Sequence, residues 1–489
     1  MQSKENRVLW KEEVDQLLKQ LKITPGYGLK AMTQLRIHSH GEEKALFEKL
    51  DTIEDLIRIL STHAYVEKQI YEFFRTLPDI HQELEDLLLG YVPTYESCLK
   101  LKLFLLQHGV LELKAPVLFH EIVFPVSRFL HRTMCLHILD PGCQGLPTFY
   151  LDGSFSLTLM ELRSQKRKLD QHMKGASEEE LPCLLELRQK IVDKEVLEED
   201  RTLQQIAKAL YPFASEWYEY ILLLSDFELS FAKACMAIQR NMVRPQLSKT
   251  GSMSWSGLRH PLVEEYLLKK KQQYIPVDVE CEPGTTVITG ANMSGKSVTM
   301  RAIFINCFLF QAGFFVFASG ANLPLFEQLT FLEEARHDAE QGISSFASEV
   351  MQLQHHIDLY KDRFVLLGLD EFARSTNPDE GTALVQAVTS YFNQLRGFTI
   401  IATHYDDVAE EAKRHYRVRG FSHVDEQVTQ ELALSNEPLL NLQKFMDYRL
   451  DLVLSKEQIP REARLICRTF RLEPEILSYM EKKITKGKM

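Results

Sequence analysis

The segment from Gly290 to Ser297, GANMSGKS, constrains this chain more than any other stretch of its sequence. It matches the pattern G-x-x-x-x-G-K-[ST], and both flanks suit that pattern: an apolar run, VIT, precedes it and a helical run, VTMRAIFINCFLF, follows it. Glycines let successive backbone N–H groups turn toward a phosphate, at which the amino end of the following helix also points. We therefore expect a strand, a phosphate-binding loop and a helix, with ATP as the ligand.

The side chains of this loop supply what a magnesium–ATP complex needs. Lys296 adds a mobile positive charge near the phosphates, and Ser297 offers a hydroxyl to Mg²⁺. We assign Gly290, Asn292 and Gly295, together with these two residues, to the cradle around the phosphates of ATP.

Two adjacent carboxylates, Asp370 and Glu371, end a second apolar run, RFVLLGL. Ionised groups at the end of a buried strand must be paired or metal-bound. An acidic pair on the surface is the structural alternative, but the phosphate-binding loop favours a magnesium–ATP site. We expect Asp370 to hold the metal through its water shell and Glu371 to orient and deprotonate the attacking water.

A third apolar run, TIIA, ends in Thr403-His404. Ligands bind outside the carboxyl ends of parallel strands, so the three run ends are expected to converge. A single histidine after a strand is usually structural. Beside the other two motifs, His404 is predicted to sense the γ-phosphate.

The pattern of apolar residues in the sequence changes after residue 245. Residues 1–245 carry apolar side chains at helical spacing, which predicts an all-α domain. Through residues 246–435, short β-branched and aromatic runs alternate with helical patterns, which predicts an α/β domain with a mainly parallel sheet. One such run, residues 314–317, is expected to be a strand. Residues 436–489 return to a helical pattern.

Residues 158–205 alternate in charge sign and predict a long helical hairpin with its turn at residues 175–177. A basic cluster in this hairpin is a candidate for contact with DNA phosphates, but acidic side chains nearby dilute its field. A solvated helical face is the favoured interpretation. The cluster consists of Arg163, Lys166, Arg167 and Lys168.

Composition limits the classes of function. The formal net charge of −11 excludes a uniformly basic nucleic-acid binder but allows a local basic face. The eight cysteines form no CxxC pair, and the N-terminus lacks the apolar core of a secretory signal. We expect a cytoplasmic protein with no membrane partner.

Taken together, the motifs resemble those of the MutS proteins of DNA mismatch repair. The likeness lies in TGANMSGKS, LDEFARSTNPDEG and ATHY, in RHPLVE upstream, and in GISSF with Glu349 before the acidic pair. The resemblance implies an ABC-type ATPase, in which two protomers pair and each completes the other's site. It further implies that Ser344 and Ser345 reach the partner's γ-phosphate and that Tyr274 stacks on adenine.

Outside the ATPase, residues 20–245 resemble the family's helical core and lever, and residues 446–482 resemble its C-terminal helical segment, which packs on the ATPase dimer. Mismatch sensors of the family insert a Phe-x-Glu motif at the mispaired base. No such motif precedes residue 100, and Phe227-Glu228 lies in a helical run. We therefore expect no direct reading of mismatches. The hairpin is also short for a complete DNA clamp, so we do not expect stable encirclement of DNA.

Two functions follow as hypotheses. The first is an ATP-driven dimer, a homodimer by default, that acts on double-stranded or branched DNA. The second is an ATP-driven switch that acts on a protein client, which the acidic charge favours. A transporter ATPase is disfavoured because the sequence lacks a Leu-Ser-Gly-Gly-Gln signature and carries HPLVE.

Overall fold

A computed structural model describes residues 9–114, 131–290, 294–332, 345–360, 363–405, 407–420, 446–453, 467 and 472–486. The chain divides into two compact units. The helical unit comprises Lys22–Leu35 and Thr52–Cys235, and the sheet unit comprises Met1–Leu21, Arg36–Asp51 and Met236–Met489. Each unit is thus assembled from separate stretches of sequence.

Helices are the regular structure of the helical unit where it is described, in agreement with its sequence pattern. Aromatic side chains meet in its core, as where Phe104 packs 5.9 Å from Trp217 between ring centroids. No helix among the described residues is both long and apolar enough to span a lipid bilayer. The helices are α2 (Gly28–Thr33), α4 (Ala64–Thr76), α5 (His81–Leu88), α6 (Tyr95–Lys114), α8 (Arg132–Leu139) and α9 (Leu157–Met173), while α3 (Glu43–Thr62) and α10 (Leu181–Gln239) each cross a boundary between the units.

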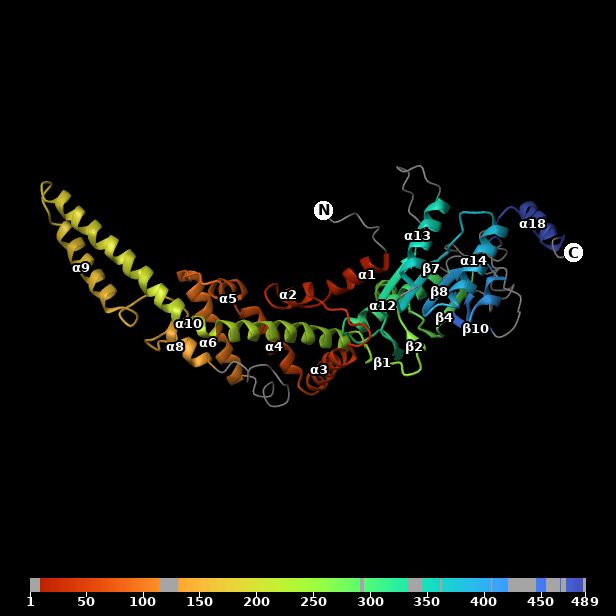
Figure 1. Ribbon diagram of the computed structural model, residues 1–489, viewed down its shortest axis with the longest axis horizontal. Helices are drawn as coiled ribbons and strands as arrows, with labels where there is room; N and C mark the ends of the chain where they lie inside the picture. The colour runs from red at the N-terminus through yellow and green to blue at the C-terminus, as the bar shows by residue number, and fades with distance from the viewer. Residues whose placement is uncertain are drawn as a thin grey trace. The chain divides into compact units, whose positions relative to one another are not determined.

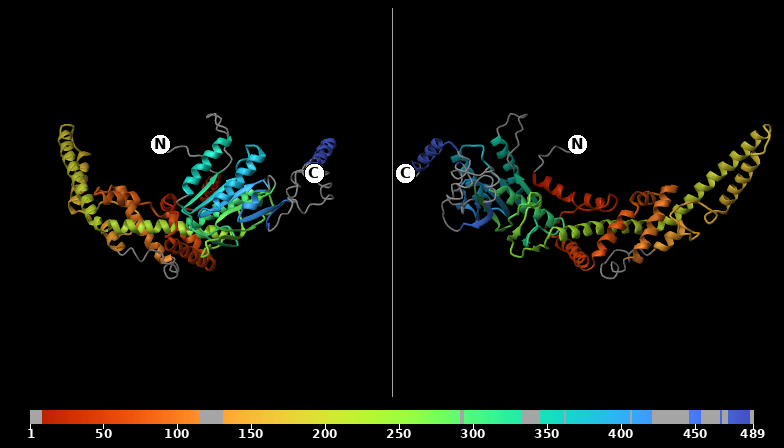
Figure 2. Two further views of the ribbon diagram at one scale, coloured as in Figure 1. Left: turned by 45° about the vertical axis from the view of Figure 1, so that its right-hand side comes forward. Right: turned by 180° about the vertical axis from the view of Figure 1, so that it is seen from behind.

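The predicted helical hairpin is present in the helical unit. Helix α9 folds back along the first turns of α10, as Figures 1 and 2 show, and the turn between them includes the predicted residues 175–177. Helix α10 continues well beyond residue 205 and tolerates Pro212 in its interior. The charge pattern therefore located the hairpin but underestimated the length of its second helix.

Two members of the basic cluster form ion pairs with acidic side chains of the same hairpin. The Arg163 guanidinium lies 2.8 Å from Glu195 and 2.6 Å from Glu199, and Lys166 also pairs with Glu195. Arg163 is buried. These pairs neutralise charge that DNA phosphates would otherwise attract. The prediction of a solvated face holds for Arg167 and Lys168, which are exposed, but not for Arg163.

Glu228 of α10 is a buried carboxylate that holds the loop at residues 24–28. Its Oε1 accepts a hydrogen bond from the Thr24 backbone N–H at 2.6 Å. Its Oε2 accepts from the Thr24 hydroxyl at 2.9 Å and from the Gly28 backbone N–H at 2.6 Å. Burial raises the pKa of Glu228, and these bonds oppose that rise. A side chain at residue 28 would collide with the carboxylate, since a Cβ there would lie 2.9 Å from Oε2.

Replacing Glu228 with glutamine is expected to lower the free energy of unfolding by about 1.5–3 kcal/mol. The amide of glutamine would turn an N–H donor toward donors of the loop, so at least one hydrogen bond would be lost. Chemical denaturation followed by circular dichroism measures the change. Glu219→Gln, at an exposed position of the same helix, serves as the matched control. Equal unfolding free energies for the two variants would contradict this account.

The main sheet of the sheet unit has the order β10-β9-β4-β8-β7-β6. Neighbours from β9 to β6 pair in parallel, and β10 is antiparallel to β9. A mainly parallel sheet was predicted, and this part of the prediction is confirmed. The strands are β4 (Gly284–Thr289), β6 (Gln328–Leu332), β7 (Val365–Asp370), β8 (Gly397–Thr403), β9 (Arg414–Gly420) and β10 (Asp447–Leu452).

Helices connect and cover these strands (Figure 1). Leu367 and Ile401, on the neighbouring strands β7 and β8, share a buried core with Val385 and Phe392 of α14. This core keeps the ends of β7 and β8 in place. The helical elements of the sheet unit are α11 (Pro261–Lys269), α12 (Lys296–Gln311), α13 (Ser345–Tyr360), α14 (Pro378–Phe392), the 3₁₀ helix η2 (Asp407–Glu411) and α18 (Pro474–Lys486).

A second sheet, which the sequence patterns did not predict, has the order β1-β5-β2-β3. The expected strand at residues 314–317 is corrected: Val316 forms an isolated antiparallel bridge with Val243. The Phe317 backbone N–H donates to the Asn306 side chain at 2.6 Å, so a side chain replaces a strand partner. Residues 314–317 are thus buried without forming a strand of either sheet. The strands are β1 (Gln246–Leu247), β2 (Met253–Leu258), β3 (Val277–Cys281) and β5 (Gly320–Leu323).

The helical expectation for residues 436–489 also needs correction. Within the described part of this segment, α18 is a helix, but β10 is a strand that extends the main sheet. Strand β10 is short, and its pairing with β9 decides its conformation rather than its own periodicity.

The N-terminal helix α1 (Leu9–Leu18) belongs to the sheet unit, where it packs on α12. Trp10 is buried, with its ring 5.7 Å from that of Phe304 and 6.1 Å from that of Phe308. Glu13 lies 3.3 Å from Arg301 of α12. Helix α1 therefore covers the helix that follows the phosphate-binding loop.

Candidate nucleotide-binding site

The ends of β4, β8 and β7 bring the three sequence motifs to one edge of the main sheet. Thr289 of β4 lies opposite Thr403 of β8, and Ala402 of β8 lies opposite Asp370 of β7. The phosphate-binding loop, His404 and the acidic pair therefore leave adjacent strands in the same direction. This convergence was expected from the order of apolar runs.

The phosphate-binding loop has the backbone that its glycines allow. Gly290 and Gly295 have φ angles of 149° and 94°, which side chains disfavour. Lys296 begins α12, and its Nζ donates to the Gly290 carbonyl at 2.8 Å. The buried hydroxyl of Ser294 has no hydrogen-bond partner among the described residues. A polar group is thus left unsatisfied beside the amino end of a helix, where an anion is favoured.

Ser297 and Asp370, the two residues predicted to hold the metal, are in direct contact. The Ser297 hydroxyl donates to Asp370 Oδ1 at 2.9 Å. Burial raises the pKa of Asp370, and the hydrogen bond from Ser297 opposes that rise. A divalent cation beside the carboxylate would favour its ionised form, and hydroxyl and carboxylate oxygens are the ligands that Mg²⁺ prefers.

Glu371 lies between two cations. Its Oε1 is 3.7 Å from the Lys296 ammonium, and its Oε2 accepts a hydrogen bond from Arg374 at 2.7 Å. Its backbone adopts a φ of 49°, which is uncommon for a residue with a side chain. Arg374 was not predicted, although it stands three residues after Glu371 in the quoted DEFAR motif.

A cavity of about 310 Å³ adjoins the phosphate-binding loop. Lys296, Ser297 and Glu371 line its polar end, and apolar and aromatic side chains from α11 and the following strand line the rest. Tyr274, predicted to contact adenine, is part of this lining, and its hydroxyl accepts a hydrogen bond from the His260 backbone at 3.1 Å. The cavity thus combines a charged end with an aromatic end.

Tyr448 is a wall of the same cavity that sequence reasoning missed. It comes from β10 and lies against the phosphate-binding loop, where a Cβ on Gly295 would approach its ring to 2.9 Å. No local pattern marks it, because only the pairing of β10 with β9 brings it to the loop.

His404 lies directly after β8, at the expected edge of the sheet. Its side chain is exposed, and its ring centroid is 4.4 Å from that of Tyr405. The assignment of His404 as a γ-phosphate sensor stays a prediction. Asn292 and Ser344 lie outside the described residues, as does the side chain of Ser345, whose backbone begins α13.

The residues present fit a magnesium–ATP complex. The loop offers an unsatisfied buried hydroxyl, a helix amino end and an ammonium group to phosphates. The contact between Ser297 and Asp370 offers oxygen ligands to a cation. The adjoining cavity supplies aromatic surface for the adenine ring of the nucleotide.

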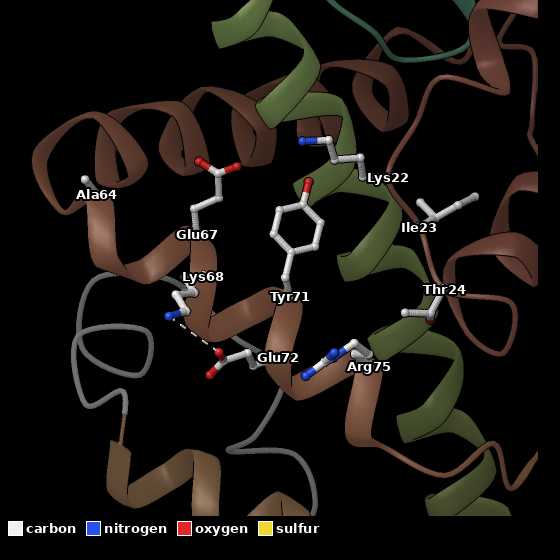
Figure 3. Close-up of a pocket in the computed structure, with 9 residues that line it drawn as sticks. All are labelled: Lys22, Ile23, Thr24, Ala64, Glu67, Lys68, Tyr71, Glu72 and Arg75. Atoms are coloured by element: carbon white, nitrogen blue, oxygen red, sulfur yellow. Dashed lines mark ion pairs between the residues drawn. The ribbon is translucent and has the colours of Figure 1, made fainter.

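A second cavity, of about 510 Å³, lies in the helical unit between residues 22–24 and one face of α4 (Figure 3). Its lining mixes basic and acidic side chains, and Lys68 and Glu72 pair across 3.9 Å. The ammonium of Lys22 lies 6.0 Å from the centre of the Tyr71 ring. This mixture of charges indicates no single class of ligand.

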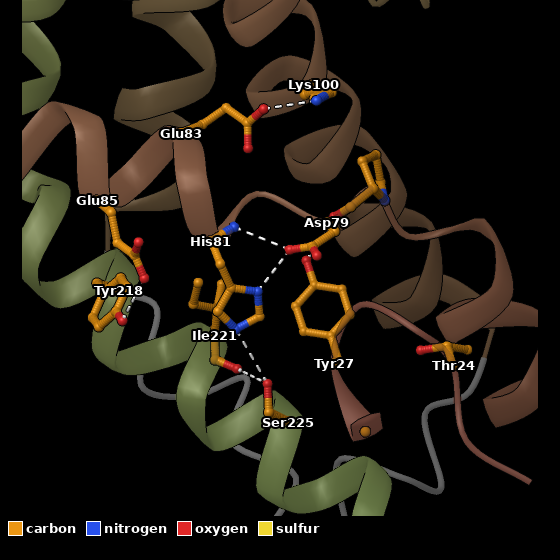
Figure 4. Close-up of polar contacts among 12 residues, drawn as sticks. Thr24, Tyr27, Asp79, His81, Glu83, Glu85, Lys100, Tyr218, Ile221 and Ser225 are labelled. Carbon is orange, nitrogen blue, oxygen red and sulfur yellow. Dashed lines mark hydrogen bonds and ion pairs between the residues drawn. The ribbon is translucent and has the colours of Figure 1, made fainter. Parts of the chain in front are cut away.

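The helical unit also contains an Asp-His-Ser arrangement (Figure 4). His81 Nδ1 lies 2.7 Å from Asp79 Oδ1, and its Nε2 lies 3.4 Å from the Ser225 hydroxyl. That hydroxyl donates to the Ile221 carbonyl at 2.8 Å, and both His81 and Ser225 are buried. A serine that is committed to its own helix and closed to substrate is no nucleophile, so this arrangement joins α5 to α10.

Known proteins match the part of the chain that carries the phosphate-binding loop. The family model for MutS domain V matches residues 286–443. The DNA mismatch repair protein MutS of Leptospira interrogans is 30% identical over 232 residues, which are 45% of this chain and 27% of that protein. MutS of Streptococcus equi is 33% identical over 211 residues, 42% of this chain and 23% of that protein.

Endonuclease MutS2 of Caldicellulosiruptor saccharolyticus is 27% identical over 233 residues, which are 47% of this chain and 28% of that protein. The matched part spans about a quarter of the length of each of these relatives. The segment that carries the phosphate-binding loop is therefore similar to MutS domain V and to the corresponding part of MutS and MutS2 proteins.

Proposed function

We propose that this protein binds ATP with Mg²⁺ and hydrolyses it to ADP and phosphate. The observation that carries the proposal is one cavity edge at which Lys296, Ser297 and Glu371 converge, with Asp370 in contact with Ser297. The match of residues 286–443 to MutS domain V and the similarity to MutS proteins support the same activity.

Each residue has a chemical role in this proposal. Lys296 neutralises phosphate charge, while Ser297 and Asp370 hold Mg²⁺, the latter through its water shell. When bound, Mg²⁺ stabilises negative charge on the phosphates. Glu371 orients a water molecule and takes its proton as that water attacks the γ-phosphate. His404 contacts the γ-phosphate after Thr403, at the end of β8.

The finer proposal is an ABC-type pair of protomers with composite sites. In it, Ser344 and Ser345 of one protomer reach the γ-phosphate bound by the other, and Tyr274 stacks on adenine. Residues 436–489 would contribute to the homodimer. This arrangement rests on the family resemblance, and the position of Tyr274 in the cavity supports it. A cytoplasmic location agrees with eight cysteines that are all free thiols.

For the client, we propose double-stranded or branched DNA, bound without direct reading of a mismatch. Two of the relatives are named for DNA mismatch repair. Phe227 and Glu228 are buried in α10, and Glu228 holds the loop at residues 24–28, so neither side chain is available to a base. A protein client is the alternative, which the internal ion pairs of the hairpin favour over extensive phosphate contact.

A DNA-dependence experiment separates the two clients. ATP turnover and DNA affinity are measured with matched, mismatched and branched duplexes at low and moderate salt. We expect weak binding that is indifferent to mismatches and that falls as salt rises, because bound phosphates release counterions. Stimulation of turnover by any duplex supports a DNA client, and no binding or stimulation at low salt supports a protein client. A clear preference for mismatched over matched duplex would contradict the absence of mismatch reading.

A further inference from the structure

Glu349 of α13 is a buried carboxylate that contacts the loop after the acidic pair. Only 2% of its surface is exposed. Its Oε2 accepts a hydrogen bond from the Ala373 backbone N–H at 2.9 Å, and its Oε1 accepts from the Ser375 hydroxyl at 2.9 Å. Both oxygens are therefore directed at one short segment of chain.

That segment has a backbone that needs support. Glu371 and Ala373 have φ angles of 49° and 62°, in the left-handed region that favours glycine. Residues with side chains stay in this region only where their surroundings hold them there. The Glu371 backbone N–H donates to the Ala402 carbonyl at 2.9 Å, which fixes the start of the segment on β8.

Ala373 is held from both sides. Glu349 binds its N–H, and the Tyr405 hydroxyl donates to its carbonyl at 3.1 Å. Burial, with a smaller contribution from the Glu349 charge, raises the pKa of Tyr405, so its hydroxyl keeps the proton that it donates. The peptide groups two residues after Glu371 therefore have fixed partners on α13 and after β8.

We propose that Glu349 is a positioning residue for hydrolysis: by fixing the left-handed segment at Ala373, it keeps the Glu371 carboxylate beside Lys296. The inference rests on the proposed ATPase function and on Glu371 as the base. Glu349 lines no part of the nucleotide cavity as described, so it acts through the loop and not on ATP.

The chemistry of the two contacts allows a sharp test. Glu349→Ala removes both acceptors and leaves a buried N–H without a partner. Glu349→Gln can keep both bonds, because its oxygen accepts from the Ala373 N–H and its NH₂ donates to the Ser375 hydroxyl, which is able to accept. The glutamine variant thus shows whether Glu349 acts through its two hydrogen bonds or through its negative charge.

The experiment measures kcat, KM and ATP affinity for the wild type and both variants, with Met351→Ala, exposed on the same helix, as the control. A displacement of the base of about 1 Å costs about 100-fold in rate, so kcat of Glu349→Ala should fall by that order. Its ATP affinity should stay within about threefold, since Lys296 and Ser297 keep their places, and Glu349→Gln should restore most of kcat.

A second readout is independent of hydrolysis. Amide hydrogen exchange in the peptide that spans residues 371–376 should accelerate in Glu349→Ala but not in Glu349→Gln or Met351→Ala. Unchanged exchange in Glu349→Ala overturns the proposal, as does wild-type kcat in that variant, an equal loss of ATP affinity and kcat, or a failure of Glu349→Gln to rescue. A wild-type chain without ATPase activity would instead overturn the proposed function, and the exchange measurement would still decide whether Glu349 holds the loop.

Discussion

Lys296→Ala is expected to weaken ATP binding by about 100-fold or more, because truncating one partner of a buried charged contact costs several kcal/mol. Lys296 is 3% exposed, donates to the Gly290 carbonyl and lies 3.7 Å from Glu371. Its loss removes the positive charge from the floor of the cavity and leaves the phosphates opposite carboxylates. Titration with a fluorescent ATP analogue measures the effect, and turnover should be lost in parallel.

The control for this variant is Lys413→Ala, which removes an exposed lysine of the sheet unit at the far end of β4. It should bind ATP as the wild type does. Thermal melting of both variants separates a loss of binding from a loss of fold. Wild-type affinity in a folded Lys296→Ala protein would place the nucleotide elsewhere in the molecule.

Glu371→Gln is expected to bind ATP with nearly unchanged affinity and to hydrolyse it about 10²–10⁴-fold more slowly. Glutamine has almost the same shape and can still accept the hydrogen bond from Arg374, so the cavity keeps its form. It is unable to take a proton from water at neutral pH, so the chemical step stalls. Single-turnover hydrolysis and equilibrium binding together separate these two effects.

The stalled variant also tests the composite site. Glu371→Gln should accumulate as an ATP-dependent dimer, which light scattering detects, whereas Glu380→Gln, at an exposed position of α14, should behave as the wild type. Turnover at the wild-type rate would show that Glu371 is not the base. A monomer that holds unhydrolysed ATP would contradict the pairing of two protomers.

The local parts of the site were predictable because each is encoded in contiguous residues. The phosphate-binding loop needs glycines at Gly290 and Gly295, and the structure gives both of them positive φ angles. The acidic pair follows an apolar run, and Asp370 meets Ser297 because parallel strands end at one edge. For such features, the physical cause and the sequence pattern coincide.

Other parts depend on contacts between distant residues, which a single sequence does not display. Tyr448 reaches the loop only through the pairing of β10 with β9. Residues 314–317 look like a strand because they are apolar, but a side chain of α12 takes the backbone N–H of Phe317. In the sequence, Glu349 stands out only as part of the likeness to MutS proteins. Its contacts with Ala373 and Ser375 become visible only in the folded chain.

The position of α1 has a practical consequence for dissecting this protein. A fragment that began at residue 246 would contain the predicted α/β domain from its first residue, yet it would lack the helix whose Trp10 packs against Phe304 and Phe308. It would expose apolar surface on the very helix that begins with Lys296, and it would be prone to aggregate. A shortened protein that keeps the sheet unit intact should therefore retain α1, and a mutation in α1 is a mutation in the unit that carries the phosphate-binding loop.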